Sequence, residues 1–239
     1  MRRLRVTALI IAATLAVLNG GTARAVDWKT LDLKSGKMLR YALVLPKAFD
    51  SEKTYPVLLA FPGGSQDERT VDGGFRYWGE QAATRGWIVV SPAASSGVLF
   101  FRGGEILIPA LLAEIRHEFK VEHGRFHVAG ISNGGLSAFR VATLYPEDFL
   151  SITTLPGAPP SKADWDRLPV VANMPVRMFG GSEDESWVRS MQKAERELRR
   201  LGADVQLEVF EGEGHVPRSL RGYAVMVSID ESRRLISDE

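Results

Sequence analysis

Three residues of the types that act together in nucleophilic catalysis occur in one chain order: Ser132, then Asp184, then His215. A serine hydroxyl is a weak nucleophile until a base removes its proton, and imidazole does so near neutral pH. A carboxylate orients the imidazole ring and stabilises the imidazolium that forms. The set therefore predicts a Ser132 nucleophile, a His215 base and an acid at Asp184.

Ser132 lies in the stretch HVAGISNGG, at the centre of a G-x-S-x-G pattern between Gly130 and Gly134. The pattern alone is weak, because a glycine-rich chain can contain it by chance. Here it closes an apolar run at 125–132 and opens a helix-like segment at 133–146, the context that a strained strand-to-helix turn requires. The glycines let the flanking backbones approach, so the turn is predicted to expose Ser132.

The same turn predicts an oxyanion site. The N–H of Asn133 lies at the N-terminus of the predicted helix, where a developing negative charge is favoured. A second donor is expected from Gly63 or Gly64, the glycine pair that ends another apolar run.

The acid is one of three adjacent carboxyl residues, Glu183, Asp184 and Glu185. Each has an alternative interpretation, in which it only caps or charges the N-terminus of the helix predicted at 185–202. We select Asp184 as the acid of the triad.

The other histidines have structural interpretations: His117 at the solvent edge of a helix, His123 in a turn and His127 inside a strand. No H-x-x-x-H pair or carboxylate–histidine cluster indicates a metal, and no cofactor is expected. Some aromatic residues either line a substrate cleft or pack in the interior, namely Trp78, Trp165, Trp187 and the VLFF stretch at 98–101.

Apolar runs alternate with helix-like segments, which predicts a doubly wound α/β domain with a mostly parallel sheet and helices on both faces. We expect an antiparallel edge or near-edge strand at 38–46, and further strands at 55–64, 87–92, 125–132, 149–157, 175–181 and 204–212. We expect helices at 79–86, 106–119, 133–146 and 185–202, and from about 217 onward. Such sheets bind ligands outside the carboxyl ends of their strands, so the triad residues are predicted to meet at that edge.

The first 25 residues have the layout of a secretory signal peptide. Three arginines within the first five residues precede an apolar run at 6–18, and an A-x-A site ends at Ala25. A membrane anchor needs about 20 apolar residues, and this run is shorter. We expect cleavage after Ala25, one domain at 26–239, no membrane anchor after cleavage, and a secreted or periplasmic location.

The 239 residues are 45% hydrophobic and 25% charged, which is typical of a globular domain. Cysteine is absent, which excludes disulfides, thiolate nucleophiles and zinc–sulfur sites. Residues 1–25 carry four arginines and no acid, so their removal changes the formal charge from +1 to −3. No basic stretch indicates nucleic-acid binding, and nothing in the sequence indicates an oligomeric state.

Four stretches resemble motifs of the α/β-hydrolase superfamily: GISNGG its nucleophile elbow, FPGGSQ its oxyanion loop, GSEDESWV its acid loop and GEGH its histidine loop. The resemblance covers nearly all of the chain after the predicted signal peptide. It is strongest to small secreted serine esterases, the feruloyl-esterase and polyhydroxybutyrate-depolymerase-like group and its dienelactone-hydrolase-like relatives. It implies Asp184 as the acid, and cleavage of a small-molecule or polymer-linked ester through an acyl-serine intermediate.

Two departures from the superfamily pattern concern the site. Pro62 stands where many members have histidine, so the oxyanion loop is expected to have its own shape, with Gly64 as the assigned donor. The segment at 158–174 has little room for the lid that many lipases carry, which implies an open site.

Other functions remain as alternatives. The same triad cleaves amides, so a serine peptidase of the prolyl-oligopeptidase type is the alternative enzyme. A catalytically silent α/β-hydrolase scaffold that binds a ligand is a second alternative, although no triad residue is missing. A nucleotide-binding domain is disfavoured, because GISNGG is not G-x-G-x-x-G and no G-K-[ST] occurs.

Overall fold

The computed structural model describes residues 26–33, 36–94 and 96–237, so the predicted signal peptide lies outside the described residues. The strands are β1 (Asp27–Asp32), β2 (Met38–Val44), β3 (Thr54–Tyr55), β4 (Val57–Phe61), β5 (Ile88–Ala93), β6 (Lys120–Val121), β7 (Phe126–Ile131), β8 (Phe149–Leu155), β9 (Val176–Gly181) and β10 (Val205–Phe210). The α-helices are α1 (Glu68–Arg85), α2 (Ile108–Glu118), α3 (Asn133–Leu144), α4 (Lys162–Asp166), α5 (Glu185–Arg200) and α6 (Gly222–Ser237). Short 3-10 helices are η1 (Gly104–Leu107), η2 (Glu122–Gly124), η3 (Pro146–Asp148) and η4 (Leu168–Val171).

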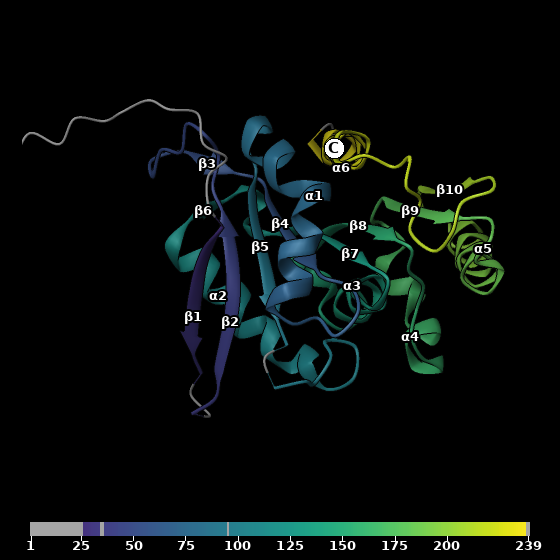
Figure 1. Ribbon diagram of the computed structural model, residues 1–239, viewed down its shortest axis with the longest axis horizontal. Coiled ribbons are helices and arrows are strands. Elements are labelled where there is room, and N and C mark those ends of the chain that lie inside the picture. The colour runs from purple at the N-terminus through teal and green to yellow at the C-terminus, as the bar shows by residue number, and fades with distance from the viewer. Residues whose placement is uncertain (1–25, 34–35, 95, 238–239) are drawn as a thin grey trace, which may run out of the picture.

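Eight strands form one sheet in the order β1-β2-β5-β4-β7-β8-β9-β10 (Figure 1). Strand β2 is antiparallel to both of its neighbours, β1 and β5. The remaining neighbours, from β5 to β10, are parallel. The sheet is therefore the mostly parallel one that the sequence predicts, and 38–46 is the near-edge strand.

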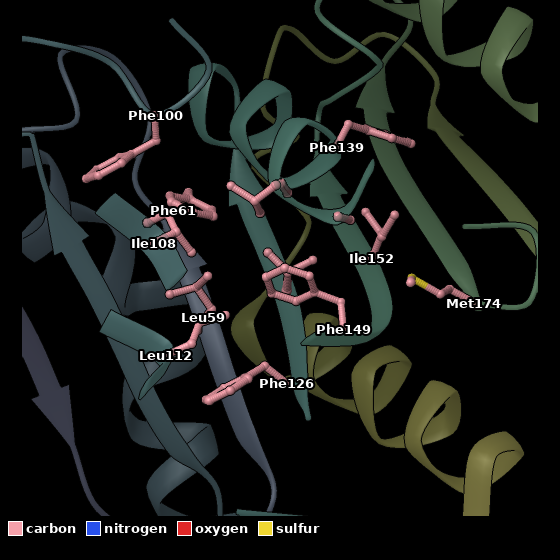
Figure 2. Close-up of a cluster of buried hydrophobic side chains, with 14 of the residues drawn as sticks. Leu59, Phe61, Phe100, Ile108, Leu112, Phe126, Phe139, Phe149, Ile152 and Met174 are labelled. Atoms are coloured by element: carbon pink, nitrogen blue, oxygen red, sulfur yellow. The ribbon is translucent and has the colours of Figure 1, made fainter. Parts of the chain in front are cut away.

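Helices cover both faces of the sheet. Helices α2, α3 and α5 share one hydrophobic cluster with it, and α1, which lies in front of the strands in Figure 1, shares another with α6. Alternate side chains of β4 enter the two clusters, and Figure 2 shows Leu59 and Phe61 beside Ile108 and Leu112 of α2. Burial on both faces explains the continuous apolar run of this strand, and each large side chain contributes roughly 1.5–3 kcal/mol.

The helix predicted at 79–86 is wrong in its start, because α1 already begins at Glu68. The carboxylate of Asp67 caps it by accepting the N–H of Thr70 at 2.9 Å. Glycines within the helix conceal its apolar periodicity.

Two further differences concern exposed segments. Strand β1 was not predicted, because its side chains are exposed or half-buried and show no clear alternation. The last helix begins at Gly222 rather than near residue 217. Among the described residues, no helix is both long enough and apolar enough to cross a membrane.

The sheet has a topological switch point between β4 and β7. From β4 the chain continues to β5 on one side, and the later strand β7 is added on the other side. Ligands of open α/β sheets bind at the carboxyl ends of strands beside such a point. Ser132 directly follows β7, and Gly63 lies two residues after β4, so both lie at this place.

Candidate active site

Ser132 joins β7 to α3 with a strained backbone, at φ 55° and ψ −116°. A residue with a side chain rarely adopts a positive φ, and such strain concentrates at functional sites. Three backbone hydrogen bonds hold the residue in place. Its N–H donates to the carbonyl of Leu155 at 3.1 Å, and its carbonyl accepts the N–H groups of Gly135 at 2.8 Å and Leu136 at 3.1 Å.

The glycines around Ser132 are required by contact between backbones. A Cβ on Gly130 would lie 2.0 Å from the carbonyl oxygen of Gly134. A Cβ on Gly134 would lie 2.2 Å from the carbonyl oxygen of Phe61, and one on Gly135 would lie 2.2 Å from that of Pro156. These distances are too short for any side-chain carbon, so the G-x-S-x-G-G pattern is the one that lets this turn form.

Ser132, His215 and Asp184 form a continuous hydrogen-bonded chain. The Nε2 atom of His215 lies 2.7 Å from the Ser132 Oγ atom, and its Nδ1 atom lies 2.5 Å from an Asp184 carboxylate oxygen. A carboxylate only accepts, so Nδ1 carries the proton and Nε2 is left to accept the serine proton. The His215 side chain is 37% exposed, and that of Asp184 is 23% exposed, so solvent reaches the imidazole.

The structure distinguishes Asp184 from its acidic neighbours. Glu183 and Glu185 are exposed, and Glu185 forms an ion pair with Arg189 at 2.9 Å. Asp184 is the residue before α5, yet its side chain does not cap that helix. Its second carboxylate oxygen accepts the hydroxyl of Ser186 at 3.1 Å. The capping interpretation therefore does not describe this carboxylate.

The acid loop and the histidine loop meet closely. A Cβ on Gly181, at the end of β9, would lie 2.0 Å from the carbonyl oxygen of Gly214. Within the histidine loop, the carboxylate of Glu213 accepts the hydroxyl and, at 3.1 Å, the N–H of Ser219, so these contacts join the residues before and after His215. These hydrogen bonds lower the pKa of Glu213. The segment that carries the imidazole is thus held by its contact with the acid loop and by hydrogen bonds within its own loop.

The three residues predicted to form the oxyanion site lie around Ser132. Asn133 opens α3, where the first backbone N–H groups have no acceptor within the helix. A Cβ on Gly63 would lie 3.7 Å from the Cβ of Ser132, and the carbonyl of Gly64 accepts the side-chain amide of Asn133 at 2.8 Å. The two loops that carry these residues are therefore in direct contact.

The aromatic residues divide between site and core. Trp187, in the first turn of α5, packs the edge of its ring against His215 with centroids 5.1 Å apart. Trp78 is buried in the cluster under α1 and α6, and Trp165 packs against the opposite cluster. The sequence signal for Trp187 was its spacing of three residues from Asp184, which puts both at the start of one helix.

The stretch 98–101 is divided: Phe100 and Phe101 are buried, whereas Val98 is 46% exposed. Phe100 is fully buried and lies against Phe61, with ring centroids 5.3 Å apart. Its N–H donates to the side chain of Gln66 at 2.8 Å. Gln66 is a buried polar residue that the sequence analysis did not single out, although it belongs to the FPGGSQ stretch.

The remaining histidines lie away from Ser132. His117 and His123 are exposed. His127 is buried near the amino end of β7, where its Nδ1 atom lies 2.7 Å from the hydroxyl of Ser151. Burial lowers the pKa of His127 to about 3. Within the described ranges, no cluster of three or more His, Asp or Glu side chains suits a metal ion.

Comparison of the sequence with known proteins gives one distant relative. No family model matches the chain. Over 152 residues it is 27% identical to the dipeptidyl-peptidase 5 of Porphyromonas gingivalis, and the match covers 59% of this chain and 22% of that protein.

Solved structures share the fold at low sequence identity. A thermostable esterase has a TM-score of 0.71 at 16% identity, over 90% of this chain and 63% of that one. A ferulic acid esterase has a TM-score of 0.66 at 18% identity, over 87% and 97% of the two chains. The dienelactone hydrolase of Anabaena variabilis has a TM-score of 0.61 at 16% identity, over 89% and 98%. The chain therefore has the α/β-hydrolase fold, as its motifs predict.

Proposed function

We propose that this protein is a secreted serine hydrolase that cleaves carboxylic esters through an acyl-serine intermediate. The observation that carries the proposal is the chain of hydrogen bonds from Asp184 through His215 to Ser132, at 2.5 and 2.7 Å. Ser132, the proposed nucleophile, lies in a strained turn at the carboxyl edge of the sheet. Esterases among the structures of the same fold support the choice of esters.

In the proposed reaction, the Ser132 oxygen attacks the acyl carbon while Nε2 of His215 takes the hydroxyl proton. The tetrahedral intermediate collapses as His215 gives that proton to the leaving alcohol. Water then attacks the acyl-serine with His215 as base, which releases the acid and restores the hydroxyl. Asp184 holds the ring and stabilises the imidazolium in both steps.

The negative charge of each tetrahedral intermediate falls on the former carbonyl oxygen. We assign its stabilisation to the backbone N–H of Asn133 and to that of Gly63 or Gly64. The N-terminus of α3 adds the favourable end of a helix dipole at the same place.

The test is intact-protein mass after incubation with a fluorophosphonate. The expected result is one adduct on the wild type and on Ser151→Ala, and none on Ser132→Ala. Turnover of a nitrophenyl ester should fall by several powers of ten in Ser132→Ala. A folded wild type that forms no adduct would favour the silent scaffold, and an active Ser132→Ala would exclude this mechanism.

The same mass spectrum tests export. Protein recovered from the periplasm or the medium should lack residues 1–25, as cleavage after Ala25 requires. A full-length mass in the fraction that holds the activity would contradict the secreted location.

A serine peptidase is the second candidate, favoured by the similarity to a protein named dipeptidyl-peptidase 5. The chain spans only 22% of that protein, so the match concerns a part of it. Matched ester and anilide substrates with the same acyl group separate the two candidates. A higher kcat/KM for the anilide would support the peptidase.

A further inference from the structure

Gln66 is a fully buried polar residue between the end of β4 and the N-cap of α1. Its backbone has a φ of 56°, which a residue with a side chain rarely adopts. Burying an amide costs free energy unless its donors and acceptor find partners. The cost of burying the amide and the strained backbone of Gln66 together indicate that its hydrogen bonds stabilise the surrounding structure.

Gln66 binds the two carbonyl groups of the loop that carries the second oxyanion donor. Its backbone N–H donates to the Gly63 carbonyl at 3.0 Å, and its side-chain Nε2 donates to the Pro62 carbonyl at 3.2 Å. A trans peptide is planar, with its N–H opposite its C=O. Holding the carbonyls of Pro62 and Gly63 therefore fixes the directions of the N–H groups of Gly63 and Gly64, which point away from Gln66.

Gln66 also ties this loop to the helix of the nucleophile. Its Nε2 donates a second hydrogen bond to the buried hydroxyl of Ser137 at 2.9 Å, and that hydroxyl donates to the Asn133 carbonyl at 3.0 Å. The side chain of Asn133 returns to the loop at the Gly64 carbonyl, at 2.8 Å. These bonds connect Gln66, Ser137, Asn133 and the glycine loop, so both predicted donor segments are held in one network.

The acceptors of Gln66 hold a third segment. Its side-chain oxygen accepts the N–H of Phe100 at 2.8 Å, and its backbone carbonyl accepts the N–H of Ala94 at 2.7 Å. Both donors lie in the segment after β5. All four polar groups of the residue, the backbone N–H and C=O and the side-chain amide nitrogen and oxygen, are thus paired, as a rigid buried network requires.

We propose that Gln66 is the positioning residue of the oxyanion site, which aims the N–H groups of Gly63 and Gly64 at the developing oxyanion relative to that of Asn133. The inference rests on the proposed hydrolase function. Because Gln66 acts through these peptides, its loss should weaken binding of the tetrahedral state and leave binding of the ester almost unchanged.

The experiment compares Gln66→Met with the wild type in ester turnover. Methionine keeps the length of the side chain and removes its hydrogen bonds. We expect kcat to fall by about 10²-fold, the usual effect of misplacing or losing an oxyanion donor, with KM within about threefold. Affinity for a trifluoromethyl ketone, which forms a tetrahedral adduct with the serine, should fall by the same factor as kcat/KM.

Ser151→Ala is the matched control for stability. It also removes a buried side-chain hydrogen bond, at the amino ends of β7 and β8, away from Ser132. It should lower the melting temperature without changing kcat or ketone affinity. An unchanged kcat in a folded Gln66→Met variant would overturn the positioning role, as would a loss confined to KM.

Ser137→Ala gives a second test if Gln66→Met fails to fold. It removes one partner of Gln66 and should lower kcat by about threefold to tenfold, the value of one hydrogen bond, with KM unchanged. An unchanged kcat in Ser137→Ala would then overturn the proposal. Wild-type protein with neither ester turnover nor a fluorophosphonate adduct would refute the hydrolase function and this role together. A wild type with both, beside an unaffected variant, would refute the positioning role alone.

Discussion

Strand β7 has a serine–histidine pair near each end. At the carboxyl end, Nε2 of His215 lies 2.7 Å from Ser132, and at the amino end, Nδ1 of His127 lies 2.7 Å from Ser151. A tryptophan packs edge-on against each imidazole, with ring centroids 5.1 Å apart for His215 and 4.9 Å for His127, at 70° in both cases. The local contacts are thus nearly the same.

The surroundings of the two pairs differ. His215 has the carboxylate of Asp184 on its second nitrogen, whereas the second nitrogen of His127 is buried without a hydrogen-bond partner in the described chain. The side chain of His215 is 37% exposed, and His127 is 1% exposed. Ser132 has a strained backbone and directly precedes helix α3, whereas Ser151 lies inside strand β8. A serine–histidine contact therefore becomes a candidate for catalysis only with a carboxylate, solvent access and nearby N–H donors.

Within this comparison, the largest effect is expected from neutralising the carboxylate of Asp184, a group that the His127–Ser151 pair does not have. Asp184→Asn should lower kcat for a nitrophenyl ester by about 10⁴-fold, because the amide favours the wrong tautomer of His215. Steady-state kinetics measures the loss, and circular dichroism should show an unchanged fold. Glu183→Gln and Glu185→Gln are matched controls, since both side chains are exposed, and a severe loss in either alone would make Asp184 the wrong choice of acid.

The two tryptophans should separate stability from activity. Trp87 is fully buried against His127, and its indole N–H donates to Asp230 at 2.8 Å. Trp87→Ala should lower the free energy of unfolding by about 3–5 kcal/mol in denaturant titrations, without lowering kcat of the folded fraction. Trp187→Ala, at a half-buried position beside His215, should cost less stability and change the ester kinetics. A loss of activity in Trp87→Ala, with a loss of stability alone in Trp187→Ala, would contradict a catalytic role for His215 and a structural role for His127.

The buried histidine predicts a pH dependence of stability. Burial, aided by Arg233, His123 and Arg125, lowers the pKa of His127 from its ordinary 6.5 to about 3. Between these values the unfolded chain binds a proton at this residue that the folded protein does not. The free energy of unfolding should therefore fall as the pH drops below 6.5, by at most about 1.4 kcal/mol per pH unit from this group.

Comparison with His127→Asn isolates that contribution, because carboxyl groups titrate in the same range. The amide nitrogen of asparagine replaces the Nδ1 atom that faces Ser151, and it does not titrate. The variant should show a shallower slope between pH 6 and 5 in denaturant titrations. Equal slopes for the two proteins would mean that His127 is protonated in the folded state.

The sequence predicted the parts of the fold and site that rest on backbone contact. The glycines flanking Ser132 are needed because any Cβ would collide with a carbonyl oxygen, so the glycine pattern itself predicts the turn. The continuous apolar runs likewise predict strands that are covered on both faces. The chain order of strand ends then places Ser132, Asp184 and His215 at one edge.

Features that depend on side-chain hydrogen bonds leave no comparable pattern in the sequence, so they could not be predicted from it. Gln66 holds segments that are far apart in the chain, and nothing local distinguishes it from an exposed glutamine beside Ser65 and Asp67. His127 and His215 could not be separated by their contacts with serine, since those contacts form only in the folded chain. The exposed strand β1 left no apolar alternation to detect.

The smallest expected effect concerns the second oxygen of the triad acid. The hydroxyl of Ser186 donates to Asp184 at 3.1 Å, and no comparable carboxylate contact exists around His127 among the described residues. Ser186→Ala removes one hydrogen bond to a charged group that is 23% exposed, so water can replace it in part. We expect kcat to fall by about threefold, measured with the same ester.

Ser190→Ala is the matched control for this change, because its hydroxyl lies one turn later in α5 and donates to the Ser186 carbonyl at 3.0 Å. It should leave kcat unchanged. An effect of Ser186→Ala as large as that of Asp184→Asn would mean that the carboxylate depends on this hydroxyl for its position, and that His215 alone does not hold it. No effect would mean that the 2.5 Å contact with His215 is enough to hold the Asp184 carboxylate in position. The hydroxyl of Ser186 would then not be needed for catalysis.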